Sequence, residues 1–323
     1  MQEYSRPLSI GAISIAALTL LSACGGAGGG GSGTVAPAAT ALSGTAAKGI
    51  VKGGRVLVCR IVNGTPEPDA SCASTATGND GSFSVAMSDG YTGPAMVKIM
   101  AGAGSMMSDE STGTDIPYAM TMRALVPAMS SGTTAYVTPF SEMAASAVGT
   151  SGIDAGRMTQ AMATVQTMMT SLGIDLNVMP MVNLRNDGAD SEMLGRQANM
   201  VKQLARVMMA AKNSSALTDV NGVPCNAPGT SAAQQVACAI NSMSSVMSGP
   251  GTFDASKFGS VLGALNSQTV TSVAMPIMRA DGSIGMQTAD MSSDASIQAA
   301  MQQAGMMTTT AATAVPIMMQ RMR

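Results

Sequence analysis

Methionine is the residue type whose abundance and spacing first suggest chemistry in this sequence. The 323 residues include 32 methionines and no histidine. Thioether sulfur is a soft ligand that selects Cu(I). The candidate ligands for such an ion form four close pairs, which are Met120 and Met122, Met179 and Met181, Met275 and Met278, and Met318 and Met319. Cu(I) is therefore the one cofactor that the composition suggests.

Two simpler interpretations of the methionines compete with copper. Methionine replaces leucine in a protein core at little cost and fills irregular gaps. Met158, Met162 and Met169 stand at helical spacing, where any amphipathic helix places an apolar residue. Methionine is also oxidised reversibly to its sulfoxide, so exposed methionines can consume oxidant. We favour packing and expect no cofactor, with Cu(I) binding or oxidant scavenging as the alternative function.

The cysteines suggest disulfides. Cys59 and Cys72 form one pair in the sequence, and Cys225 and Cys238 form a second pair with the same spacing. Four cysteines allow three connectivities, and we expect local pairing within each half of the chain. The close Cys-x-x-Cys spacing of a zinc site is absent. The sequence therefore predicts two structural disulfides.

Composition excludes several classes of function. Without histidine, Ser-His-Asp catalysis, Cys-His catalysis and histidine-based zinc sites are impossible. Charged residues make up 11% of the chain, and its net charge is −2, so neither a carboxylate-pair enzyme nor a nucleic-acid-binding protein is supported. Aromatic residues are 2%, which argues against stacking surfaces for bases or sugars. Asp187, Asp190 and Glu192 lack the spacing of an EF-hand. We predict that the chain is not an enzyme.

The first 23 residues have the pattern of a secretory signal peptide. Residues 7–23 carry no charge and are rich in isoleucine and leucine, but the run is too short for a convincing membrane-spanning helix. Residues 21–24, "LSAC", resemble the lipobox of bacterial lipoproteins. That resemblance implies cleavage before Cys24 and lipidation of its thiol. In such lipoproteins an aspartate after the cysteine favours the inner membrane, so Gly25 implies the outer membrane. The alternative is an ordinary signal peptide.

Residues 24–42 are rich in glycine and alanine and predict a flexible tether. Beyond them, residues 43–140 alternate short apolar runs with glycine and proline, which is typical of a small antiparallel β-sandwich. The expected strands cover residues 55–61, 82–87, 94–100, 118–126 and 133–140. Asn79-Asp80-Gly81 predicts a tight turn before the second of these strands.

Two stretches of this region carry a family resemblance. "GTAAKGIVKGGRVLV" (residues 44–58) and "GNDGSFSV" (residues 78–85) are similar to the carboxypeptidase-regulatory-like, prealbumin-type β-sandwich. Such modules recur in proteobacterial surface lipoproteins, some of which share "AYVTPFSEMA" (residues 135–144) as a strand that enters a helix. The resemblance implies an accessory or adhesive module that has no catalytic residues.

The pattern becomes helical after residue 140. Helices are expected over residues 141–149, 154–172, 190–212, 231–248, 254–267 and 294–307, with Asp154 capping the second. Residues 275–286 predict a hairpin that turns at Asp281-Gly282. The fold class is therefore α+β, with the small antiparallel β-sandwich followed by a Met-rich, all-α, bundle-like domain over residues 141–323.

Together these features predict a protein anchored to the outer membrane through lipid on Cys24. It would face either the periplasm or the cell exterior. We expect a non-enzymatic structural or binding module of the cell envelope. Its partner would be another envelope protein or a surface polymer.

Overall fold

Alternation of buried and exposed side chains defines the strands of the first half. The computed structural model describes residues 39–87, 89–176, 191–278 and 284–292. In the strand Ser82–Met87, every second side chain is buried, as one covered sheet face requires. The strands of this half are β1 (Thr40–Ala46), β2 (Val51–Lys52), β3 (Arg55–Val62), β4 (Thr65–Pro66), β5 (Ala73–Ala76), β6 (Ser82–Met87), β7 (Ala95–Met100), β8 (Met106–Ser108), β9 (Asp115–Pro117), β10 (Met122–Val126) and β11 (Thr133–Val137).

These strands form three sheets. One has the order β11-β1-β6, a second has the order β10-β7-β3-β4 with β5 also paired to β3, and a small third sheet has the order β2-β8-β9. The described pairs are antiparallel except β1 with β11, which run parallel. A parallel pair needs a long connection, and the strands between β1 and β11 supply it. The first two sheets share one apolar core, to which Leu42, Val85, Val58, Val97 and Met122 contribute.

The helices begin where the sequence provides caps. They are α1 (Pro139–Val148), α2 (Ala155–Thr170), α3 (Ser191–Asn213), α4 (Ala232–Ser244) and α5 (Ala255–Asn266). Thr138 caps α1 directly after β11, and Pro139 occupies the first turn, where its missing N–H costs nothing. Asp154 accepts a hydrogen bond from the Arg157 backbone N–H at 2.8 Å and caps α2 as predicted.

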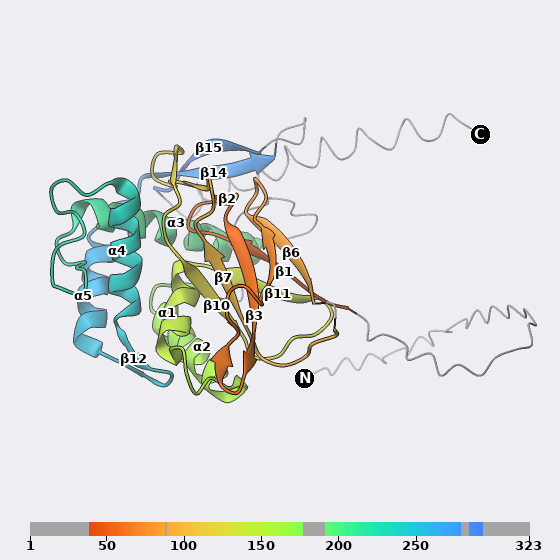
Figure 1. Cartoon of the computed structure of the whole chain (residues 1–323). Coiled ribbons are helices and arrows are strands. Elements are labelled where there is room, and N and C mark those ends of the chain that lie inside the picture. The colour runs from red at the N-terminus through yellow and green to blue at the C-terminus, as the bar shows by residue number, and fades with distance from the viewer. Residues whose placement is uncertain (1–38, 88, 177–190, 279–283, 293–323) are drawn as a thin grey trace, which may run out of the picture. The chain divides into compact units, whose positions relative to one another are not determined.

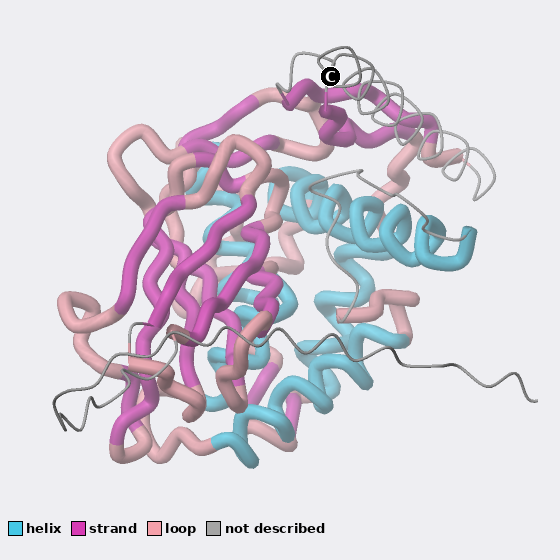
Figure 2. The backbone as a smooth tube through the Cα atoms, turned by 90° about the vertical axis from the view of Figure 1, so that its right-hand side faces the viewer, coloured by secondary structure: helices cyan, strands magenta, loops and turns pink. Residues whose placement is uncertain are grey.

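The helices after residue 140 share a core with the sandwich. Ile61, Met96 and Leu125 lie on the face of the second sheet that points away from the sandwich core, and they pack in one cluster with Phe140 of α1 and Met158 of α2. In Figures 1 and 2 the helices lie along one side of the strands. The second sheet is therefore covered on both faces.

The mixed α and β content agrees with the sequence prediction, but the second half is not all helical. It contains the hairpins β12 (Met247–Gly249) with β13 (Thr252–Phe253) and β14 (Ser272–Met278) with β15 (Ile284–Asp290). The second hairpin agrees with the one that the sequence predicts over residues 275–286, whereas the first lies partly where the sequence predicts a helix over residues 231–248. The strand β12 replaces its end, since Gly249-Pro250-Gly251 favours a turn. The predicted helix 294–307 lies outside the described residues. Within the described part, none of the helices has the length and apolarity needed to cross a membrane.

Candidate functional site

Both predicted disulfides are present. Cys59 is bonded to Cys72 with a Cα–Cα distance of 4.5 Å, and Cys225 is bonded to Cys238 with a Cα–Cα distance of 5.4 Å. A carboxylate oxygen of Asp69 and the two sulfurs of the first disulfide all lie within 4.8 Å of one another, close enough for three ligands of one metal ion. Its two sulfur neighbours are bonded to each other, however, and Asp69 forms an ion pair with Lys98 at 2.6 Å. This group is therefore a disulfide beside an ion pair.

The described methionines are mostly buried among apolar side chains. Met122 is completely buried in β10, whereas Met120 just before it is half-buried. Met275 and Met278 lie on β14, but their side chains are not described. Met179, Met181, Met318 and Met319 lie outside the described residues, as do Cys24, Asp187 and Asp190. Among the described side chains, Met96, Met143, Met158, Met168, Met169 and Met243 belong to the core that α1 and α2 share with the sheet.

A buried lysine is the most unusual titratable group of the described part. Lys48 is fully buried in the turn after β1, and its Nζ lies 3.1 Å from Oε2 of Glu110, which is also buried. Glu110 accepts a second hydrogen bond from the backbone N–H of Gly49. Burial lowers the pKa of Lys48, although Glu110 opposes this shift. A buried lysine with a lowered pKa is a candidate for catalysis, but solvent does not reach this one, so we assign it to the core.

Asp109, which precedes Glu110 in the chain, forms a second ion pair, with Lys212 of α3. This pair joins the sandwich to α3. Asp109 accepts a hydrogen bond from Lys212 Nζ at 2.6 Å and two more from the backbone and hydroxyl of Ser111. Burial raises the pKa of Asp109, but the hydrogen bonds from Lys212 and Ser111 outweigh burial and hold it below the ordinary value of 3.8. The carboxylate is therefore ionised above that pH and stabilises the fold there.

Asp109→Asn is expected to lower the free energy of unfolding at pH 7 by about 2 kcal/mol, because it removes a charged hydrogen-bond acceptor. The folded-state pKa is below the unfolded one, so the native contribution of Asp109 is lost as the pH falls through its folded pKa. Urea unfolding at pH 7, 5 and 3 should therefore show the difference between the two proteins shrinking toward acid. A difference that stayed constant with pH would contradict this account.

A hollow of about 520 Å³ lies between the second sheet and the helices. We call it the sheet hollow. Its charged side chains are already paired, Lys98 with Asp69, and Arg123 with Glu142, whose carboxylate lies 2.5 Å from the guanidinium. Met96, Met100 and Met120 also line it. The sheet hollow is thus a groove with thioethers and neutralised charges.

A second hollow of about 530 Å³ lies between α4, α5 and the loop before α4. We call it the loop hollow. Its wall is rich in short polar side chains, which come from Thr218, Asp219, Asn241, Ser242, Ser245 and Ser260. Lys257 of α5 also lines it and is exposed.

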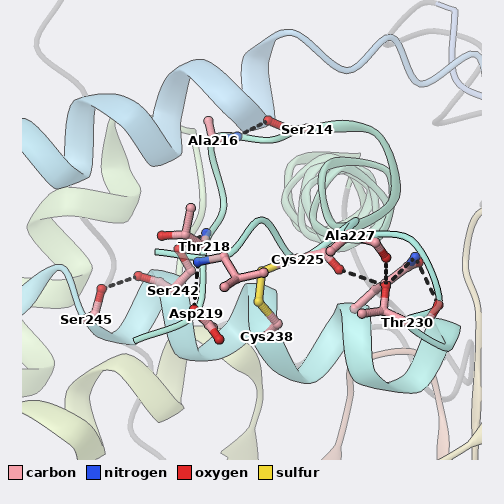
Figure 3. The surroundings of a disulfide bond; sticks show 12 residues. Ser214, Ala216, Thr218, Asp219, Cys225, Ala227, Thr230, Cys238, Ser242 and Ser245 are labelled. Atoms are coloured by element: carbon pink, nitrogen blue, oxygen red, sulfur yellow. Dashed lines mark hydrogen bonds between the residues drawn. A yellow bond between two sulfur atoms is a disulfide. The ribbon is translucent and has the colours of Figure 1, made fainter. Parts of the chain in front are cut away.

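A disulfide fixes the loop that forms one wall of the loop hollow. Figure 3 shows the bond between Cys225 in the loop and Cys238 in α4, with Thr218 and Ser242 close by. The Thr218 backbone N–H donates to the Ser242 hydroxyl at 3.3 Å, and the Cys225 N–H donates to the Leu217 carbonyl at 2.8 Å. Thr218 and Pro224 form an isolated antiparallel bridge. The loop is therefore held against α4 by covalent and hydrogen bonds.

The two hollows meet at one residue. Asn241 of α4 lines both, with Ala237 and Ile240 on the side of the sheet hollow and Ser242 and Ser245 on the side of the loop hollow. We treat the two hollows together as the candidate binding site.

Sequence reasoning found few of these residues. Of the two candidate ligands whose side chains are described, Met120 and Met122, only Met120 lines the site, and Lys257, Asn241 and the serines were not singled out. The loop and the two helices come together only in the fold, so their spacing along the chain carries no signal. The disulfide was the one indication, because it predicted that the loop at Cys225 lies beside the helix at Cys238.

Comparison with known proteins adds no family. No protein-family model, no curated protein and no solved structure matches this chain.

Proposed function

We propose that this chain is a lipid-anchored protein of the bacterial outer membrane that acts as a non-enzymatic binding module of the cell envelope. The observation that carries the proposal is Leu21-Ser22-Ala23-Cys24, followed by the glycine-rich tract of residues 25–33. Several acyl chains on one cysteine anchor a protein stably, and the glycine tract lets the folded body stand away from the membrane.

Four further features support an envelope location and a non-enzymatic binding role. Disulfides persist in oxidising compartments, and the fold contains two. Two sheets share a sandwich core, as expected from the resemblance of residues 44–58 and 78–85 to prealbumin-type modules. The two hollows provide surfaces for a ligand, and the sequence lacks the histidine that most acid–base catalysis uses.

The anchor is tested by labelling cells with a radioactive or clickable palmitate analogue. Cys24→Ala should abolish incorporation of the label and release the protein from the membrane fraction. Ser32→Ala, in the glycine-rich tract, is the matched control and should remain labelled and membrane-bound. Labelling of the Cys24→Ala protein at the wild-type level would overturn the proposed anchor.

A further inference from the structure

We propose that the loop hollow binds an acidic sugar unit of a polysaccharide, with Lys257 contacting the sugar carboxylate. This inference rests on the proposed function in one respect, because a protein of the envelope meets such polymers. It goes further by naming the chemical class of the ligand and the residues that recognise it.

Lys257 is the cation of this site that is available to a ligand. It is exposed in the first turn of α5, and no carboxylate of the described residues forms an ion pair with its ammonium. Lys98 and Arg123, at the sheet hollow, are each already paired with a carboxylate. An anionic group that enters the loop hollow therefore gains a new ion pair at Lys257 and displaces no existing one.

The other polar groups of the loop hollow match a ligand with many hydroxyls. Ser245 and Ser260 donate their hydroxyl hydrogens to backbone carbonyls at 2.8 and 3.1 Å, so their oxygens still accept hydrogen bonds. The Ser242 hydroxyl accepts from the Thr218 N–H at 3.3 Å and keeps its own hydrogen to donate. The hollow therefore offers donors and acceptors close together, as a sugar ring does.

Asp219 also lines the loop hollow and offers an acceptor for sugar hydroxyls, and its negative charge requires the sugar carboxylate to lie at Lys257 instead. Hydrogen bonds from the backbone N–H groups of Val223 and Asn221 lower the pKa of its carboxyl and fix its orientation. Val220 beside it is 93% exposed and provides an apolar surface for the C–H face of a sugar ring. Because aromatic side chains are scarce in the chain, we expect recognition through charge and hydrogen bonds, with little stacking.

Asn241 lines both hollows, so we place the further units of the polymer beside its side chain, on the side of the sheet hollow. An acidic peptide fits less well, because the polar side chains of the loop hollow are mainly short hydroxyls, which match the closely spaced hydroxyls of a sugar. The wall formed by residues 217–225 is held in place by the Cys225–Cys238 disulfide, which reduces the entropy lost on binding.

The test is calorimetric titration of the full chain, purified in a nonionic detergent, with a hexasaccharide of galacturonic acid. The matched ligand is the fully methyl-esterified hexasaccharide, which has the same backbone without the charge. The test variant is Lys257→Gln and the control variant is Arg157→Gln. Both residues are exposed at the third position of a helix whose cap is an aspartate, Asp254 or Asp154, and Arg157 lines neither hollow.

We expect the acidic hexasaccharide to bind the wild-type chain, more weakly as salt concentration rises. Lys257→Gln should weaken binding about tenfold, as loss of a charged hydrogen bond does, and Arg157→Gln should leave it unchanged. The methyl ester should bind the wild-type chain about as weakly as the acid binds to Lys257→Gln. No binding of the acid, equal binding of acid and ester, or an equal loss in both variants would overturn the proposal. Each of these outcomes is independent of the labelling of Cys24.

Discussion

Lys48→Met is expected to lower the free energy of unfolding by about 3–5 kcal/mol, which is the cost of removing one partner of a buried ion pair. The Lys48 side chain is completely buried, and the Glu110 side chain is 6% exposed. Methionine fills a similar volume, so the loss comes mainly from Glu110, whose buried negative charge would lose its partner. Urea unfolding monitored by circular dichroism measures the effect.

Two further variants separate the charge from other causes. Lys52→Met removes a lysine from the exposed ion pair with Asp115, whose side chains are 25% and 39% exposed, and should cost less than about 1 kcal/mol. The double variant Lys48→Met with Glu110→Gln should be more stable than Lys48→Met alone, because glutamine is neutral and still accepts from the Gly49 N–H. A double variant no more stable than Lys48→Met would show that the unpaired charge is not the cause.

The secondary structure was largely predictable because its signals are local. Asp154 and the apolar spacing after it define α2, and the strand predicted over residues 82–87 matches β6. The equal spacing of the cysteines indicated the correct disulfides. Each of these predictions uses residues that are close in the chain, where backbone geometry limits the possible arrangements.

The sequence contains a local sign that the second sheet is covered on both faces. The strand β3 contains the apolar run Val56–Cys59, and all four of its residues are buried. A continuous apolar run is typical of a strand covered on both faces. The predicted organisation, a sandwich over residues 43–140 followed by a separate helical domain, does not account for burial of both faces. On this second face, Leu57 and Cys59 pack with Cys72 and Met100, and Ile61, farther along the same face, packs with the helices.

The candidate site and the buried ion pairs were not predictable in this way. Lys48 and Glu110 are 62 positions apart, and Asp109 and Lys212 are 103 apart. No periodic pattern links residues at such distances, and one sequence gives no record of paired substitutions. The only local indication of a buried ion pair is Lys48 itself, which lies between Ala47 and Gly49 in a stretch that is otherwise apolar.

Gly49→Ala is expected to prevent folding or to destabilise the fold by more than about 4 kcal/mol, a loss that is exceptional for a single substitution. Gly49 has a φ of 65°, in the left-handed region, and an added Cβ would overlap the backbone carbonyl oxygen of Ser108. Backbone on both sides is fixed, because the Ser108 N–H donates to the Ile50 carbonyl at 3.0 Å and Gly49 donates to Glu110. Relief of the overlap would therefore break the contact that orients Glu110 toward Lys48.

Gly53→Ala is the matched control for this substitution. Gly53 has a φ of 64°, nearly the same conformation, but the nearest atom to an added Cβ is the Ser105 Cα at 3.9 Å. Gly53→Ala should lower the free energy of unfolding only by the cost of placing an alanine in the left-handed region, about 1–2 kcal/mol. Soluble yield and urea unfolding of the two variants then isolate the overlap with Ser108 from the conformational cost that both share. Equal stability of the two variants would mean that the turn at Lys48-Gly49 moves freely, and that the Glu110 carboxylate is not held by it.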